Sequence, residues 1–242
     1  MAYRKEVRLS EILQQLGAMT DKGADGTGKW PEKVKKREVQ HTGSGAEQEH
    51  LFQLGMPGST ASPILGHDGD PMLRDAIAKV ALYLQVQRDI YHPIGHPLDE
   101  ARKNGLRGFF APALLDRVRI VELKERRVAN PWFYPEARAK GIENLPDISH
   151  KAAVTFLDVV VFNQEITQRD LFHGLVHAAQ FKLLGIEQFT ELFVRGFLQA
   201  RSYFLIPLKA HAFRLDTRYY EDPQTPFSVE EEVRRWHDEG RY

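Results

Sequence analysis

The sequence predicts an α+β fold that is mainly helical, with a small sheet beside a central helix. Two observations predict it: most apolar residues after about residue 63 recur at helical spacing behind capping residues, and the strand patterns are few and short. The first 62 residues differ, because Gly, Ser, Thr and charged residues dominate them after one short helical pattern. We therefore expect an N-terminal helix plus an irregular arm over 1–62, and a folded domain over 63–242.

Several helices and one strand are expected in the first half of this domain. A helix over Pro71–Tyr91 is indicated by Asp70 as N-cap, by proline in the first turn and by a broad apolar stripe. Residues 98–115 read as helical material interrupted by glycines near 105–108, and 118–123 alternate like a short strand.

The second half is more sharply patterned. Residues 152–162 predict one buried strand that ends in a turn. Thr167 and Asp170 form a capping-box arrangement at the start of a helix that we expect to run to Leu184 and to end at Gly185. Further helices are expected over 187–200, over 207–219 behind a proline, and after Ser228.

The composition excludes several classes of protein. Lys plus Arg and Asp plus Glu number 33 each, so no net field attracts nucleic acid or an anionic membrane. The absence of cysteine excludes disulfides, thiolate metal ligands and cysteine nucleophiles. The N-terminus lacks an apolar run typical of a signal peptide, and no stretch approaches the ~20 apolar residues of a membrane span. We expect a soluble, cytoplasmic protein without a nucleic-acid or membrane partner, and we leave its oligomeric state open.

The most informative motif lies in the helix that begins after Thr167. His173 and His177 are four residues apart, so they lie one turn apart on one helix face and both imidazoles can reach one metal ion. In the H-E-x-x-H motif of zinc peptidases, the residue after the first histidine is the glutamate that serves as general base. Here that residue is Gly174, so the metal-binding half of the motif is present and the hydrolytic half is absent.

Two segments resemble bacterial zincin-like metallopeptidases. Residues 172–180, FHGLVHAAQ, are similar to the F-H-E-L-V-H-x-x-Q signature of such families, and 206–213, IPLKAHAF, resemble the segment that supplies a third metal ligand from a second helix. The resemblance covers roughly residues 110–220. It implies a zincin-like fold in which an edge strand, here 152–162, runs beside the metal-binding helix.

The third ligand is the open question of this comparison, because Lys209 and His211 stand where the family usually has acidic residues. With His211 as ligand, the site is His173, His177 and His211, with zinc as the favoured metal and iron as the alternative. With Lys209 in that position, an ammonium points toward the metal and prevents binding. We favour His211, since Lys209 can extend its amine to solvent.

Other residues are secondary candidates. Glu165 precedes the metal helix and is a candidate substitute acid, and Tyr203 is a candidate for stabilising an oxyanion. Glu191 is an alternative metal ligand. Asp158, inside an apolar stretch, is expected to be either exposed or paired with an arginine.

These residues favour a metal-dependent enzyme on a zincin-like scaffold that is not a peptidase and acts on a small-molecule or peptide substrate. Gly174 would then leave room beside the metal for substrate or dioxygen. One alternative is an inactive pseudo-metallopeptidase that binds a peptide or protein partner. Others are a metallohydrolase that draws its base from Glu165, and an engineered replacement of a natural glutamate by Gly174.

Overall fold

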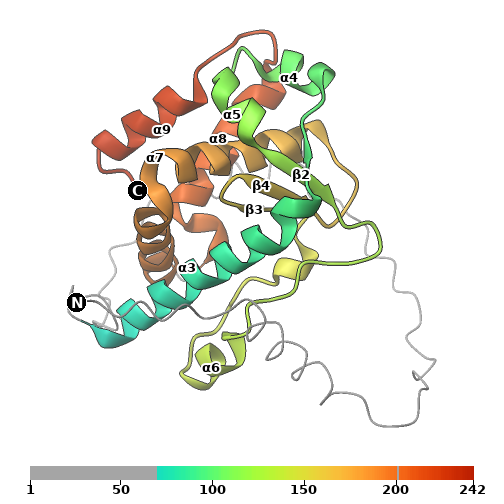
Figure 1. Ribbon diagram of the computed structural model, residues 1–242. Coiled ribbons are helices and arrows are strands. Elements are labelled where there is room, and N and C mark those ends of the chain that lie inside the picture. Colours follow the sequence, from blue (N-terminus) through green and yellow to red (C-terminus); the bar gives the residue numbers. More distant parts are fainter. Residues whose placement is uncertain (1–69, 201) are drawn as a thin grey trace, which may run out of the picture. The chain divides into compact units, whose positions relative to one another are not determined.

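The computed structural model describes residues 70–200 and 202–242, so the helix and arm expected over 1–62 lie outside the described residues. The described part is mainly helical with a small sheet, as expected for an α+β fold (Figure 1). Among these residues, no helix is both long and apolar enough to cross a bilayer.

The chain forms helix α3 first and then the first strands. The elements in this half are α3 (Pro71–Tyr91), η1 (His92–Ile94), β1 (His96–Pro97), α4 (Glu100–Leu106), α5 (Pro112–Arg117), β2 (Arg119–Glu122), α6 (Tyr134–Ala139) and η2 (Ile148–His150). The start of α3 is as predicted, because the Asp70 side chain accepts a hydrogen bond from the Met72 backbone N–H and proline occupies the first turn.

The second half contains the remaining strands and the longest helices. Its elements are β3 (Ala153–Phe156), β4 (Val159–Phe162), α7 (Gln168–Ala200), η3 (Tyr203–Leu205), α8 (Pro207–Glu221) and α9 (Val229–Asp238). Gly185 has φ 72° and ψ 169° inside α7, which kinks it into the two helices that the sequence predicts. The Thr167 hydroxyl accepts a hydrogen bond from the Asp170 backbone N–H, as expected for the cap.

The prediction of one strand over 152–162 is wrong, because this stretch forms a tight hairpin. Leu157 adopts φ +57° between β3 and β4, which pair antiparallel with Thr155 opposite Val160. Asp158 lies in this turn, where its buried carboxylate accepts hydrogen bonds from Arg88 and Arg117. The expected pairing of Asp158 with arginine is therefore confirmed, and the turn gives it a position outside the ladder.

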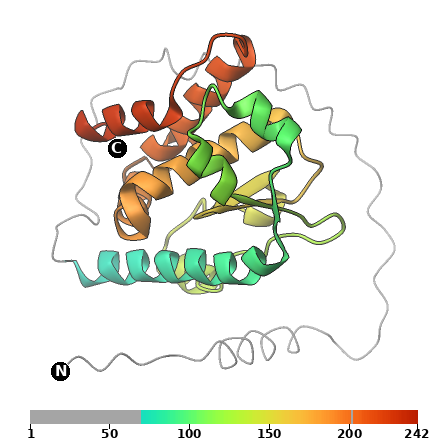
Figure 2. The same ribbon diagram turned by 45° about the horizontal axis from the view of Figure 1, so that its top comes forward.

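The sheet has the order β1-β2-β4-β3, with β2 and β4 parallel and the other pairs antiparallel. All four residues of β4 are buried, because helices cover both faces of the sheet. Val160 and Phe162 pack in the core cluster that includes α7 residues, whereas Val159 and Val161 pack in the cluster that includes Tyr83 of α3. Figures 1 and 2 show α3 on one side of the sheet and α7 and α8 on the other.

Candidate functional site

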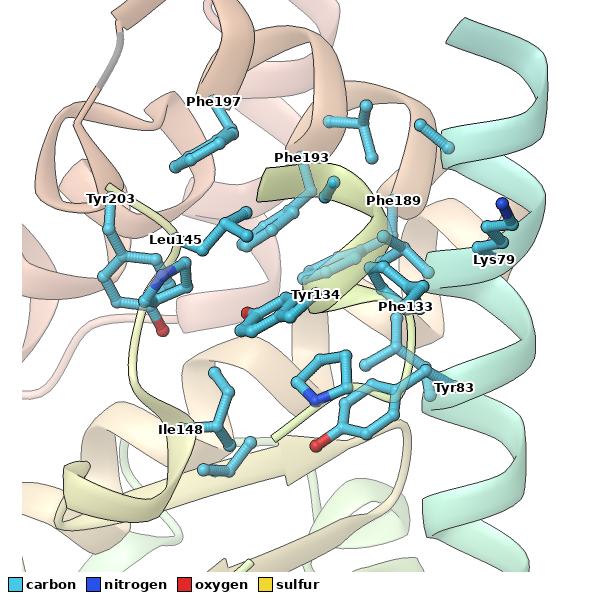
Figure 3. A pocket seen from close by; sticks show the side chains of 18 of the residues that line it. Lys79, Tyr83, Phe133, Tyr134, Leu145, Ile148, Phe189, Phe193, Phe197 and Tyr203 are labelled. Carbon is cyan, nitrogen blue, oxygen red and sulfur yellow. The ribbon is translucent and has the colours of Figure 1, made fainter. Parts of the chain in front are cut away.

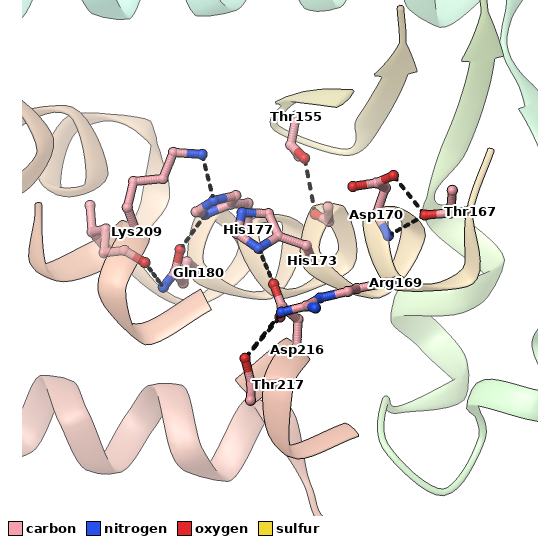
Figure 4. Close-up of polar contacts among 12 residues, drawn as sticks. Thr155, Thr167, Arg169, Asp170, His173, His177, Gln180, Lys209, Asp216 and Thr217 are labelled. Carbon is pink, nitrogen blue, oxygen red and sulfur yellow. Dashed lines mark hydrogen bonds and ion pairs between the residues drawn. The ribbon is translucent and has the colours of Figure 1, made fainter. Parts of the chain in front are cut away.

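The candidate site lies between one stripe of α7 and one stripe of α8. The α7 stripe is Arg169, His173, His177 and Gln180, which recur at helical spacing on one face. The α8 stripe is Lys209, Phe213 and Asp216. The two helices run antiparallel, so Arg169 contacts Asp216 at one end and His177 contacts Lys209 at the other (Figure 4).

Asp216 organises the first end of this interface. Its buried carboxylate accepts two hydrogen bonds from the Arg169 guanidinium, at 2.9 and 3.1 Å, and contacts His173 Nδ1 at 2.6 Å. Burial raises the pKa of Asp216 to about 6, and the Arg169 charge opposes this rise, so the group is ionised at neutral pH. Burial keeps the pKa of His173 well below its ordinary value. The neutral His173 therefore donates its Nδ1–H to Asp216 and keeps a lone pair on Nε2.

Gln180 fixes the protonation pattern of His177. The Gln180 Nε2 donates to the Leu208 backbone carbonyl at 3.0 Å, so its Oε1 must accept the hydrogen bond from His177 Nδ1, at 2.7 Å. Burial and the Lys209 charge hold the pKa of His177 well below its ordinary value. His177 is therefore neutral with its hydrogen on Nδ1, which leaves Nε2 as an acceptor.

Lys209 occupies the position in front of that acceptor. Its Nζ lies 3.1 Å from His177 Nε2 and donates a hydrogen bond to it. The Tyr203 ring centroid is 4.8 Å from the same Nζ. Burial lowers the pKa of Lys209 to about 7. The expectation that Lys209 extends its amine to solvent is wrong, because the α8 stripe that contains Lys209 faces α7.

His211 does not join the other two histidines. Its ring is fully buried on another face of α8, stacked on Trp236 of α9 at 3.9 Å, and its Nδ1 lies 2.7 Å from the Tyr242 hydroxyl. The reason is helical geometry: residues two apart, such as Lys209 and His211, differ by about 200° around the axis. Only one of them can face His177.

The donor set between α7 and α8 does not fit the predicted metal. Within residues 70–200 and 202–242, no three or more His, Asp, Glu or Cys side chains are arranged to hold a metal ion. Of the two nitrogens that would bind one, His177 Nε2 already accepts a hydrogen bond from Lys209. A cationic lysine in that direction repels a metal cation. The predicted His173, His177 and His211 site is therefore not assembled by these side chains.

Gly174 is packed against the sheet. A Cβ built on it would lie 2.6 Å from Val160 Cγ1 and 3.3 Å from Thr155 Oγ1, and this threonine donates a hydrogen bond to the Gly174 carbonyl at 3.0 Å. A side chain at position 174 would thus meet Val160 and Thr155, whereas Gly174 itself lines the cavity beside His173 and His177. A larger residue at this position would require Val160 to shift.

A mostly apolar cavity of about 180 Å³ opens beside the two histidines. Tyr203 lines it, as do His173, His177 and Lys209. Glu165 does not line it and is exposed in the loop before α7. Glu191 is exposed as well and pairs with Arg195 on its own helix. Of the secondary candidates, the structure brings only Tyr203 to the site.

Comparisons with protein-family models, with curated proteins and with solved structures found no match for this chain. The site is therefore interpreted from its own geometry.

The sequence reasoning named Lys209 only as the disfavoured occupant of the third-ligand position, and it missed Asp216, which lies on the same face of α8. A signal was available, because Lys209 and Asp216 are seven residues apart and therefore share a helix face. The α7 residues Arg169, His173 and His177 form a matching basic stripe that requires a carboxylate partner.

Proposed function

We propose that this chain is a catalytically inactive, zincin-like pseudo-metallopeptidase that binds an apolar ligand without a metal ion. The observation that carries the proposal is the 3.1 Å contact between Lys209 Nζ and His177 Nε2. In the metallopeptidases that the sequence resembles, an acidic ligand and a metal would face this nitrogen. Here one lysine side chain takes the place of both.

The remaining histidine contacts are consistent with a former metal site. A carboxylate or amide oxygen that receives one imidazole N–H is the usual means of orienting a metal-binding histidine. Asp216 has this relation to His173, and Gln180 has it to His177. Groups that could orient two metal-binding histidines are thus present, while Lys209 stands where a third ligand would be, and this combination supports a zincin-like site that binds no metal.

The glutamate that serves as general base in the H-E-x-x-H motif has no counterpart at position 174. Gly174 has no side chain, and the position is closed by Val160. A general base contributes roughly 10²–10⁴-fold to rate, so the loss of this glutamate alone reduces peptide hydrolysis strongly. Glu165, the substitute that the sequence offers, lies outside the cavity.

The cavity supports a role in binding a ligand. Its volume of about 180 Å³ far exceeds the ~10–15 Å³ that one buried water requires. Aromatic and aliphatic side chains from α3, α6 and both halves of α7 form most of its wall. Concave apolar sites with a few polar groups are the usual form of small-molecule sites.

The proposal is tested by zinc titration of the unmodified protein and of the Lys209→Glu variant. We expect no stoichiometric zinc binding by the unmodified protein, and a gain of at least about 100-fold in affinity for Lys209→Glu, which supplies an acidic ligand opposite His173 and His177. Lys182→Glu makes the same charge change on the exposed surface of α7 and should have no effect. Stoichiometric zinc binding by the unmodified protein that His177→Ala abolishes would overturn the proposal.

A further inference from the structure

Three lysines line the cavity, and two of them are neutralised by neighbouring carboxylates. Lys79 contacts Asp75 at 2.8 Å and Glu136 at 2.7 Å, and Lys140 contacts Glu136 at 2.6 Å. Lys79 and Lys140 come from α3 and from the end of α6. In Figure 3, Lys79 lies on the opposite side of the cavity from Tyr203, beside which Lys209 is found. The positive charges of these two lysines are therefore largely balanced by carboxylates and attract an anionic ligand only weakly.

Lys209 differs from Lys79 and Lys140 in the charges around its amine. Across residues 70–200 and 202–242, no carboxylate lies within ion-pair distance of its Nζ; Asp216 acts on it only through its more distant charge. An ammonium has three hydrogens, and the neutral His177 accepts one of them. A half-buried cation without a counter-charge is unfavourable, so the amine either loses its proton more readily or gains from pairing with an anion. The inner end of the cavity therefore lacks one negative charge.

The rest of the cavity has the opposite character. The rings of Phe189, Phe193 and Phe197 come from the part of α7 after the Gly185 kink, and Tyr134 and Tyr203 line the cavity near them (Figure 3). Phe189 and Phe193 are near-parallel, with ring centroids 6.3 Å apart. Such walls favour aliphatic or aromatic groups and offer little to a polar chain.

We propose that the ligand of this cavity is a small apolar monocarboxylate, such as a fatty or aromatic acid. Its carboxylate accepts a hydrogen bond from the Lys209 ammonium, and its apolar body lies among the α7 rings. This inference rests on the proposed function, which requires only an apolar ligand, and adds the charge and the position of its head group.

The physical reason is charge complementarity in a site shielded from water. Charge-assisted hydrogen bonds are stronger than neutral ones, and burial in apolar surroundings strengthens the attraction between their charges. An alcohol with the same apolar body keeps the contact with the rings but supplies no negative charge. The part of the difference between acid and alcohol that is lost on replacing Lys209 therefore measures the contribution of its charge.

The test compares the binding of octanoic acid and octan-1-ol by calorimetry, using the full chain. We expect the acid to bind at least about tenfold more tightly than the alcohol, because of one charge-assisted hydrogen bond. The Lys209→Met variant keeps the apolar stem and should abolish this preference while it leaves octanol affinity within about twofold. Lys140→Met, at the cavity rim, is the matched control and should keep the preference.

The outcomes separate this inference from the proposed function. Equal affinities for acid and alcohol, or a preference that survives Lys209→Met, would overturn the carboxylate assignment while leaving an apolar site in place. Binding of neither compound would overturn the apolar-ligand function itself. An N-acetylated dipeptide with a free C-terminal leucine is included as a third probe. Tighter binding of that peptide than of octanoate, lost on C-terminal amidation, would overturn the choice of a free acid.

Discussion

Two faces of α8 each carry a basic side chain, half-buried at Lys209 and fully buried at His211, and the two faces accommodate that side chain differently. Lys209 faces α7, where its Nζ contacts His177 and the polar stripe continues to Asp216. His211 faces α9, where it stacks on Trp236 and contacts Tyr242. Burial lowers the pKa of His211 to about 3, so it is a neutral part of the core. A buried histidine is thus the structural residue here, and the lysine is the functional candidate.

On the α8 face that contains Lys209, the largest loss of stability is expected from a change at Asp216. The Asp216→Ala variant leaves the Arg169 guanidinium and the His173 N–H without their shared acceptor. We expect the free energy of unfolding to fall by about 3 kcal/mol, measured by urea denaturation. Asp75→Ala removes an exposed carboxylate from a surface ion pair and should change it by less than about 1 kcal/mol. Equal effects of the two variants would contradict the central role of Asp216.

The contribution of Lys209 to the free energy of unfolding should depend on pH, which distinguishes this residue from His211. The pKa of Lys209 is lowered to about 7 in the folded protein, from 10.5 in the unfolded chain. Between these values the unfolded chain binds more protons, so the contribution of Lys209 to stability rises with pH and is lost as pH falls toward 7.

The free energy of unfolding of the unmodified protein, relative to that of Lys209→Met, should therefore rise between about pH 7 and 9. The limiting slope is about 1.4 kcal/mol per pH unit. Groups whose pKa values do not depend on the charge of Lys209 cancel in this difference. Lys182→Met, which removes an exposed lysine, should give a flat difference, and a flat difference for Lys209→Met as well would refute the lowered pKa.

Gly174 tests how closely the α7 stripe is held against the sheet. We expect Gly174→Ala to destabilise the fold by about 1–2 kcal/mol, because its Cβ would meet Val160 at 2.6 Å in the core. Gly105→Ala in α4 is the control, since its nearest neighbour would be 4.0 Å away, and it should stabilise the helix slightly. Thermal unfolding of both variants provides the comparison. Stabilisation by both would mean that Val160 does not fill the space beside Gly174.

The smallest effect is expected at His211. His211→Phe keeps an aromatic ring against Trp236, loses the contact with Tyr242, and removes an Nε2 that is buried without a hydrogen-bond partner among the described residues. These terms oppose each other, so the stability should change by less than about 1 kcal/mol. The pKa of Lys209 should stay unchanged. A large loss of stability together with a loss of bound metal would instead restore His211 as a ligand.

Local patterns were enough to predict most elements of the described domain. The capping residues Asp70, Thr167 and Ser228 all precede helices, and Gly185 divides α7 as its φ > 0 preference predicts. The hairpin at Leu157 was not predictable in the same way, because a leucine at positive φ gives no turn signal.

The site was predictable only in part, for a similar reason. The spacing of His173 and His177 identifies the right face of α7. Which α8 residue meets that face depends on the rotation of α8, and this rotation is set by its packing against both α7 and α9. Histidine is the better metal ligand, so the sequence favoured His211 over Lys209 as the residue that meets His177. The rotation of α8 that brings Asp216 into contact with Arg169 instead brings Lys209 into contact with His177.

The central claim is that the Lys209 amine replaces a metal in front of His177. The most direct test is the pKa of Lys209, measured by NMR from the ¹³Cε chemical shift and assigned by the signal lost in Lys209→Met. The account predicts a midpoint at about 7. A midpoint at 10.5, the ordinary value for a lysine, would mean that the amine lies in solvent and would contradict the account.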